Sequence, residues 1–244
     1  MKRIFEFIYA GIAVRYRFRN NSTARYFGRC IHLSESEDDD IFMNDAWFDR
    51  FRKVHPDDVP DDYVEYKGLL YLTAAYLLSY GCTIFHSVSF VWKEKAWLLA
   101  GKSGVGKTTQ YLNWKKLFPK EIRMISGDMP ILDFRKGRIM VCPSPWNGKE
   151  NFKGASPCEL GGIVFLKQGK ENVFHEADQC ESILTLFHQF CPIPENKEEI
   201  RILALMVERI EKEVPLWTFV NDGTQESLKV LRSAILDYLE TEEP

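Results

Sequence analysis

The stretch GKSGVGKTT, residues 101–109, indicates the fold of this chain more clearly than any other part of the sequence. It fits the pattern G-x-x-x-x-G-K-[ST], in which a glycine-rich loop binds the phosphates of a nucleotide. Gly101, Gly104 and Gly106 can adopt backbone angles that other residues avoid, so successive N–H groups can curl around an anion. The stretch therefore predicts a phosphate-binding loop.

Two side chains at the end of this loop are expected to carry chemistry. Lys107 would bring a positive charge to the outer phosphates of the nucleotide. Thr108 would offer its hydroxyl to the Mg²⁺ ion that accompanies the nucleotide. We expect the nucleotide to contact the loop residues Gly101, Lys102, Ser103, Gly104, Val105, Gly106, Lys107, Thr108 and Thr109.

The flanking sequence supplies the setting that such a loop requires. Residues 97–101, WLLAG, form a short apolar run typical of a buried strand. Residues 108–118, TTQYLNWKKLF, place large apolar side chains at helical spacing. A phosphate would then lie at the positive end of the helix. A glycine turn that binds no nucleotide is the alternative, and this strand–loop–helix order argues against it.

Composition excludes several classes of protein. Of 244 residues, 45% are hydrophobic and 14% aromatic, as in a globular protein rather than a disordered one. A net charge of −3 gives no basic field for nucleic acid, and no apolar run is long enough to span a membrane. Six cysteines without a C-x-x-C pair argue against zinc and disulfides and favour a cytoplasmic protein. The apolar N-terminus is interrupted by Glu6, so we expect a buried strand there rather than a signal peptide.

Residues 1–80 are predicted to form a small α+β module. Its first 33 residues look like two or three strands, with a turn at residues 20–22 followed by a strand in RYFGRCIHL. The acidic run at residues 35–40 is expected to be a solvated loop rather than a metal site, although it could attract a basic partner. Helices are expected at residues 46–54, capped by Asn44 or Asp45, and at residues 63–80.

Residues 81–244 are predicted to form the nucleotide-binding core of an α/β fold. ILDF and RIMV should form a hairpin, ELGGIVFLKQ and NVFHE a further strand pair, and PLWTFV a strand. Helices are expected at residues 180–190, at residues 196–212 with Asn196 as N-cap, and at residues 226–239.

Three residues outside the loop are candidates for the same site. Asp128 follows a predicted strand downstream of the loop helix, where a carboxylate can reach Mg²⁺ or an incoming hydroxyl; elsewhere it would be read as a turn former. His86 lies in the strand before the loop strand, where a structural histidine is the simpler interpretation. Lys149 follows a glycine turn in PWNGK and is either a further phosphate contact or an exposed loop lysine.

Four segments together resemble the C-terminal domain of the HPr kinase/phosphorylase family. They are FHSVSFVWKEKAWLLAGKSGVGKTT, ISGDMPIL, PSPWNGK and ELGGIVFL, within about residues 82–170. The sequence is also similar to small HPr-kinase-like proteins, and the loop resembles that of phosphoenolpyruvate carboxykinase. The resemblance implies a phosphate-loop core with a mixed β-sheet. It also gives Lys107 and Thr108 phosphate and metal roles, and implies that Asp128 and His86 are neighbours in the active site.

The sequence departs from the family pattern at the acidic residues. The family has two adjacent aspartates, but Asp128 lies between Gly127 and Met129, so either the base or a metal ligand is missing. The glutamate that precedes the next strand in the family has no match in register, and Glu159 lies about two positions away. The signature for engaging HPr is absent, so the sequence does not indicate an HPr kinase.

Two functions of different classes remain open from the sequence. The first is an ATP-dependent kinase that phosphorylates a hydroxyl of a peptide, protein or small molecule, with Asp128, His86 and Lys107 as catalytic residues and Thr108 and Asp128 holding Mg²⁺. The second is a module whose conformation responds to ATP without transfer. Carboxykinase activity is a less well supported candidate, because no second metal site or substrate-binding arginines can be identified in the sequence. The resemblance also leaves a homo-oligomer open, and the acceptor could dock on residues 1–80.

Overall fold

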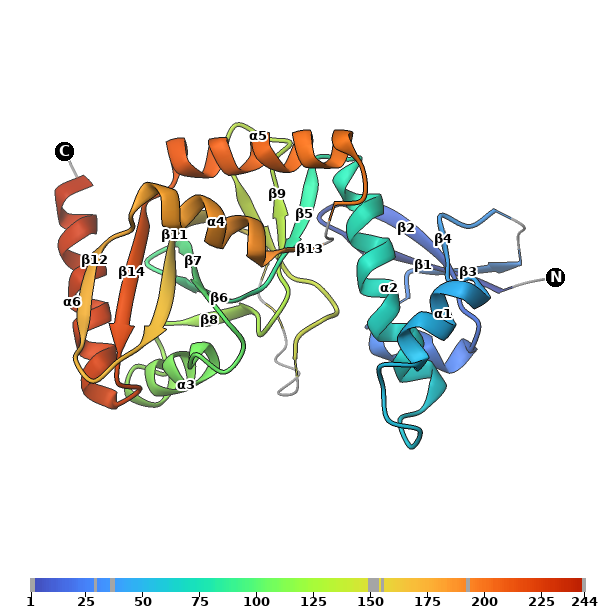
Figure 1. Ribbon diagram of the computed structural model, residues 1–244, viewed down its shortest axis with the longest axis horizontal. Coiled ribbons are helices and arrows are strands. Elements are labelled where there is room, and N and C mark those ends of the chain that lie inside the picture. The colour runs from blue at the N-terminus through green and yellow to red at the C-terminus, as the bar shows by residue number, and fades with distance from the viewer. Residues whose placement is uncertain are drawn as a thin grey trace.

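The computed structural model describes residues 3–28, 30–35, 38–148, 154, 156–191 and 194–242. Two parts of the chain lie side by side, a small N-terminal module and a larger α/β core (Figure 1). The two termini lie at opposite ends of the molecule, and helix α2 (Asp61–Leu78) lies where the two parts meet. The expected mixed α/β architecture is therefore confirmed.

The N-terminal module is built on a sheet of four described strands in the order β3-β1-β2-β4. The alternation of apolar and polar residues in the first strands buries one face of this sheet, as a period of two requires. The turn at residues 10–11 joins β1 and β2 into a hairpin, with Gly11 at a positive φ of 76°. The strands are β1 (Arg3–Tyr9), β2 (Ile12–Arg17), β3 (His32–Glu35) and β4 (Ile41–Phe42).

Two helices cover the buried face of this sheet. Helix α1 (Asp45–Arg52) begins as expected, because the Asn44 side chain accepts a hydrogen bond from the Trp47 N–H. Helix α2 is buried over much of its surface, which explains the apolar residues around its axis. Gly68 allows the two helices to touch, because a Cβ there would lie 2.3 Å from the Met43 Cε atom and 2.9 Å from the Phe51 ring.

Ten described strands form the mixed sheet of the core. Its main path runs β13-β5-β9-β10-β11-β7-β6-β8, and β14 lies between β11 and β12. The strands are β5 (Cys82–Phe85), β6 (Ser87–Trp92), β7 (Lys95–Ala100), β8 (Arg123–Ser126), β9 (Ile131–Asp133), β10 (Met140–Cys142), β11 (Cys158–Gln168), β12 (Val173–Glu176), β13 (Phe190–Cys191) and β14 (Leu216–Asn221).

Parallel pairing at the centre of this sheet positions the glycine loop. Strand β7 pairs in parallel with β11, which pairs in parallel with β14. The glycine loop follows the carboxyl end of β7, the edge at which open α/β sheets bind ligands. The core helices are α3 (Lys107–Leu117), α4 (Gln179–Gln189), α5 (Lys197–Glu213) and α6 (Gln225–Glu242).

Two of the sequence-based strand assignments are wrong. We expected β11 and β12 to pair, but β12 pairs with β14, which is inserted between them by its parallel contact with β11. We also expected a turn and then a strand after residue 20. Residues Asn21–Tyr26 instead form a 3₁₀ helix, and the strand is confined to β3. The Thr23 hydroxyl donates to Glu65 of α2 at 2.7 Å, so a tertiary contact overrides the local strand preference.

The acidic run is not simply solvated. Asp39 forms an ion pair with Arg17 at 2.7 Å, and Asp40 one with Arg15 at 3.0 Å. Both arginines lie on β2, so two carboxylates of the acidic run are neutralised by side chains of that strand. Asp39 and Asp40 are therefore not free to attract a basic partner.

Two further expectations concern the whole chain. All six cysteines are described, and each is a free thiol in the structure. Within the described ranges, no helix combines the length and the apolar character needed to cross a membrane.

One apolar cluster extends across residue 80. It contains Phe7, Tyr16 and Leu69 of the N-terminal module together with Cys82 and Trp146 of the following segment. Burial of Trp146, 2% exposed, thus depends on side chains from both parts of the chain. The surface between the two parts is consequently packed rather than loosely apposed.

Candidate functional site

The loop between β7 and α3 is held open by three glycines. Gly101, Gly104 and Gly106 have φ angles of +137°, +81° and +103°, which other residues rarely adopt. A Cβ on Gly101 would also lie 2.9 Å from the carbonyl oxygen of Leu166 in β11. Gly106 offers no side-chain cap to α3, so the first N–H groups of this helix remain available to an anion.

Lys107 lies across the mouth of this loop. Its ammonium donates hydrogen bonds to the carbonyl oxygens of Gly101 at 2.8 Å and Lys102 at 3.2 Å. Burial lowers the pKa of Lys107 from its ordinary value, and the charge of Asp128 partly opposes this shift. The positive charge is thus held at the loop by backbone carbonyls, and no carboxylate of the described ranges is in direct contact with it.

Asp128 and His86 come together from different strands. Asp128 follows β8, and its Oδ1 lies 3.4 Å from the Nε2 of His86, which joins β5 to β6. The backbone fixes this approach, because the Ser87 N–H donates to the Asp128 carbonyl at 2.9 Å. The His86 N–H donates to the carbonyl of Gln189 at 2.7 Å, and the Gln189 side chain accepts from the Gly101 N–H at 3.3 Å. This network ties the histidine to the glycine loop.

Within the part of the chain that the structure describes, no second acid is brought to Asp128. Gly127 has no side chain, and Met129 packs against the apolar cluster shared by the two parts of the chain. Glu159 forms ion pairs with Lys95 at 2.7 Å and Arg138 at 2.5 Å. It therefore lies beside the start of β7, roughly 17 Å of extended strand from the loop at the other end. Among the described residues, no group of three or more His, Cys, Asp or Glu side chains could hold a metal.

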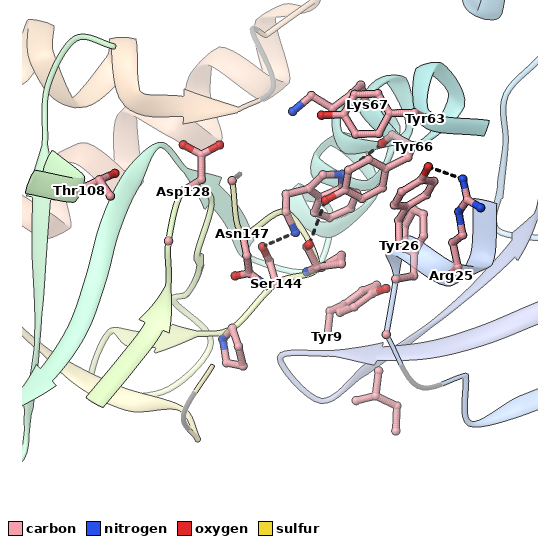
Figure 2. A pocket seen from close by; sticks show the side chains of 18 of the residues that line it. Tyr9, Arg25, Tyr26, Tyr63, Tyr66, Lys67, Thr108, Asp128, Ser144 and Asn147 are labelled. Atoms are coloured by element: carbon pink, nitrogen blue, oxygen red, sulfur yellow. Dashed lines mark hydrogen bonds between the residues drawn. The ribbon is translucent and has the colours of Figure 1, made fainter. Parts of the chain in front are cut away.

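A cavity of about 910 Å³ opens between the core and the N-terminal module (Figure 2). Its core wall contains Ser103 and Thr108 of the glycine loop together with Gly127 and Asp128. Thr108 and Asp128, which sequence reasoning assigns to the metal, thus line one space. The volume is in the range of small-ligand sites.

The opposite wall of this cavity is aromatic. Tyr26, Tyr63 and Tyr66 extend toward it from the N-terminal module, and Tyr9 lies below them (Figure 2). The Tyr26 and Tyr66 rings stack with their centres 4.9 Å apart, and Trp146 stacks on Tyr66 at 6.0 Å. We call the side chains of Tyr9, Tyr26, Tyr63, Tyr66 and Trp146 the aromatic wall.

The segment at residues 143–148 connects the two walls. The Tyr66 hydroxyl, whose pKa is raised by burial, donates to the Pro145 carbonyl at 2.9 Å. The Trp146 indole N–H donates to the Tyr66 carbonyl at 3.1 Å, and the Trp146 carbonyl accepts from the Met129 N–H at 3.1 Å. Because Met129 follows Asp128, the position of this carboxylate is linked by hydrogen bonds to helix α2.

A second cavity, of about 950 Å³, lies on the other side of the glycine loop. Its lining combines the loop, the carboxyl end of β11 and one face of helix α4, and it includes His86. His86 and Asp128 therefore line different cavities while their side chains are 3.4 Å apart. Ser103 lines both spaces, so the glycine loop separates them.

The structure places the remaining sequence-based candidates in different ways. Lys102, Ser103, Gly104 and Val105 line the second cavity, whereas Thr109 is exposed on the first turn of α3. Lys149 lies outside the described residues. The aromatic wall and Gln189 were missed, because they come from distant segments and carry no motif of their own.

Comparisons with known proteins include a distant structural likeness. No protein-family model and no curated protein matches the chain. Among solved structures, the chain resembles the Hpr(Ser) kinase/phosphatase from Coxiella burnetii, with 13% identity over 53% of this chain and 91% of that one, at a TM-score of 0.27.

Proposed function

We propose that this chain is an ATP-dependent phosphotransferase that moves the terminal phosphate of ATP to an alcohol hydroxyl, such as that of a serine. The observation that supports this most directly is the shared cavity of Thr108 and Asp128, with His86 in contact with the carboxylate. Phosphoryl transfer needs a phosphate cradle, a cation site and a group to receive the proton of the acceptor. These three elements lie around one loop.

The glycine loop and Lys107 fit the phosphates. Backbone N–H groups at positive φ angles and the uncapped start of α3 can surround an anion. The Lys107 ammonium can exchange its two carbonyl partners for phosphate oxygens, which bind it more strongly because they are charged. The second cavity lies at the carboxyl ends of β7 and β11 and would take the remainder of the nucleotide.

Magnesium fits the same place. The Thr108 hydroxyl and the Asp128 carboxylate are oxygen ligands, and Mg²⁺ in such sites is commonly held by one or two protein oxygens plus phosphate and water. When bound, the ion would neutralise charge on the outer phosphates.

Transfer of the terminal phosphate would then follow from the alignment of the acceptor hydroxyl with that phosphate. The acceptor hydroxyl oxygen bonds to the terminal phosphorus as the bond from that phosphorus to the bridging oxygen breaks, and ADP leaves. The hydroxyl proton passes to Asp128, whose carboxylate His86 orients at 3.4 Å. Lys107 would neutralise the charge of the phosphates, whereas Asp128 would accept the proton of the hydroxyl, so two different side chains perform these two tasks.

The test is transfer from labelled ATP with Mg²⁺ to a library of serine peptides, followed by mass measurement of an added phosphate. We expect Asp128→Asn to retain nucleotide binding and to lose roughly 10²- to 10⁴-fold in transfer rate. Asp57→Asn, at an exposed residue outside both cavity linings, should transfer at the wild-type rate. Normal transfer by Asp128→Asn would contradict the proposed role of this carboxylate.

A second candidate function is a nucleotide-responsive binding module without transfer. The observation that favours it is the environment of Asp128, where Gly127 and the packed Met129 leave one carboxylate in place of an acidic pair. Protein that binds ATP, but neither transfers phosphate nor hydrolyses ATP faster when an acceptor is added, would support this module over the kinase.

A further inference from the structure

The charges around the 910 Å³ cavity differ between its two walls. The core wall carries the carboxylate of Asp128, whereas the lining from the N-terminal module carries Arg25 and Lys67. Figure 2 shows Lys67 extending from α2 above the aromatic wall. A ligand that fills this cavity therefore meets an anion at one wall and cations at the other.

The two cations are not equivalent. Arg25 is already neutralised, since it lies 2.9 Å from Asp62 and donates to the Tyr26 hydroxyl at 2.7 Å. Lys67 has no carboxylate partner among the described residues, and its ammonium lies 6.0 Å from the centre of the Tyr63 ring. Lys67, a half-buried residue, is thus the one of these two described lining cations that remains free to pair with a ligand.

Two polar atoms in the lining also lack partners. The Tyr9 side chain is 94% buried, and its hydroxyl has no hydrogen-bond partner among the described residues. The Oδ1 of Asn147 is buried and unpartnered in the same sense. Buried polar groups are nearly always hydrogen-bonded, so the described lining leaves two polar atoms whose hydrogen-bonding capacity is unused.

The aromatic wall indicates the remaining chemistry. Tyr26 and Tyr63 are half-buried and present ring surface to the cavity, whereas Tyr66 and Trp146 form the packed base behind them. Such a surface binds apolar groups and planar peptide bonds, and tyrosines supply it with little loss of side-chain entropy. The cavity is too large for a lone hydroxyl group or anion and suits a short segment of chain.

We propose that this cavity binds an acidic peptide segment as the acceptor. A carboxylate of the peptide forms an ion pair with Lys67, and the acceptor hydroxyl of the peptide is directed toward Asp128. This inference rests on the proposed function, because it takes the glycine-loop side of the cavity as the phosphate donor. Lys67 determines which peptide is chosen, whereas Lys107, Thr108 and Asp128 act on the phosphate.

The test measures binding and does not require transfer. Full-length protein is incubated with a non-hydrolysable ATP analogue and a library of short peptides with a fixed serine and randomised flanks, and bound peptides are sequenced. We expect the wild type to enrich Asp and Glu near the serine. Lys67→Ala should lose this enrichment, and Lys67→Glu should enrich Lys and Arg instead. The exposed Lys53→Ala, in the same module, should select as the wild type does.

A matched pair of peptides then isolates the contact. One selected peptide and its Glu→Gln counterpart should differ roughly tenfold in Kd for the wild type, as expected for loss of one charged contact of about 1.4 kcal/mol. For Lys67→Ala the two peptides should bind alike, with the affinity for the ATP analogue unchanged.

Several results would overturn the inference while leaving the proposed transferase standing. They are a wild type that selects no acidic residues, acidic selection that survives in Lys67→Ala, and a Lys67→Ala protein that loses ATP affinity instead of peptide affinity. Selection of acidic peptides without transfer of phosphate would support the peptide site and contradict the transferase.

Discussion

The two walls of the cavity are built in different ways. The core wall is made of turns at the ends of strands and of the first turn of α3, with Thr108 and Asp128 within two residues of a glycine. The opposite wall is made of large side chains from β1, the 3₁₀ helix and α2, which pack on Trp146. The first wall depends on backbone conformation and the second on side-chain volume.

Because of this difference, the core wall mainly serves ligand binding, whereas the aromatic wall also stabilises the fold. Backbone turns can be rigid while leaving their N–H groups and short side chains free for a ligand. An aromatic wall fills space, so its inner rings are part of the apolar core as well as part of a binding surface. Substitutions on the two walls should therefore affect different measurements.

The largest expected effect is on stability, from Trp146→Ala. The side chain is 2% exposed and contacts Tyr9, Phe27 and Tyr66, so truncation leaves a large void and removes the hydrogen bond from the indole N–H to the Tyr66 carbonyl. We expect a loss of about 3–5 kcal/mol in the free energy of unfolding, measured by denaturant titration. Trp146→Phe, which keeps most of the volume, should lose less, and equal losses would show that packing is not the cause.

Lys107→Ala should produce the opposite pattern. Its loss removes the cation at the phosphates, so transfer should fall by roughly 10²- to 10³-fold. The melting temperature should stay near that of the wild type, because the two hydrogen bonds of Lys107 are offset by the cost of burying its charge. Lys116→Ala, exposed on the same helix, is the control for both measurements. A large fall in melting temperature would make the core wall structural as well, and the contrast between the walls would be lost.

The smallest effect is a dependence of stability on pH. Burial lowers the pKa of Lys107 below its ordinary value of 10.5, so the unfolded chain binds this proton more tightly than the folded one. The contribution of Lys107 to stability should rise as the pH increases from the lowered pKa toward 10.5. Denaturant titrations across this range should give a smaller rise for Lys107→Met than for the wild type, and identical slopes would contradict the shift.

Local features of the fold could be predicted from the sequence. The glycine pattern at residues 101–106, the cap at Asn196 and the apolar spacing of α2 each depend on residues a few positions apart. The order of strand, loop and helix around β7 follows from the same short-range information. The contact of His86 with Asp128 was implied by the family resemblance, and the geometry now gives it a distance of 3.4 Å.

The pairing of distant segments could not be predicted in this way. Strand β14 enters between β11 and β12 from nearly fifty residues away, and nothing in NVFHE distinguishes the two possible neighbours. Likewise, Tyr9 and Trp146 meet only because the 143–148 segment reaches the N-terminal module. The position of Glu159 is also a matter of register, since its ion pairs with Lys95 and Arg138 follow from how β11 is aligned with its neighbours.

Trp146 has a further consequence for how the molecule can be observed. Of the six tryptophans, it is the one among the described residues that lines this cavity, whereas four others lie in the cluster beneath α3 and α6. Its indole N–H donates a hydrogen bond to the Tyr66 carbonyl of the N-terminal module. Its backbone carbonyl accepts one from the N–H of Met129, the residue after Asp128. An indole so placed senses the polarity of the cavity and the separation of its walls at once. The protein thus carries its own optical reporter at the point where its two parts meet.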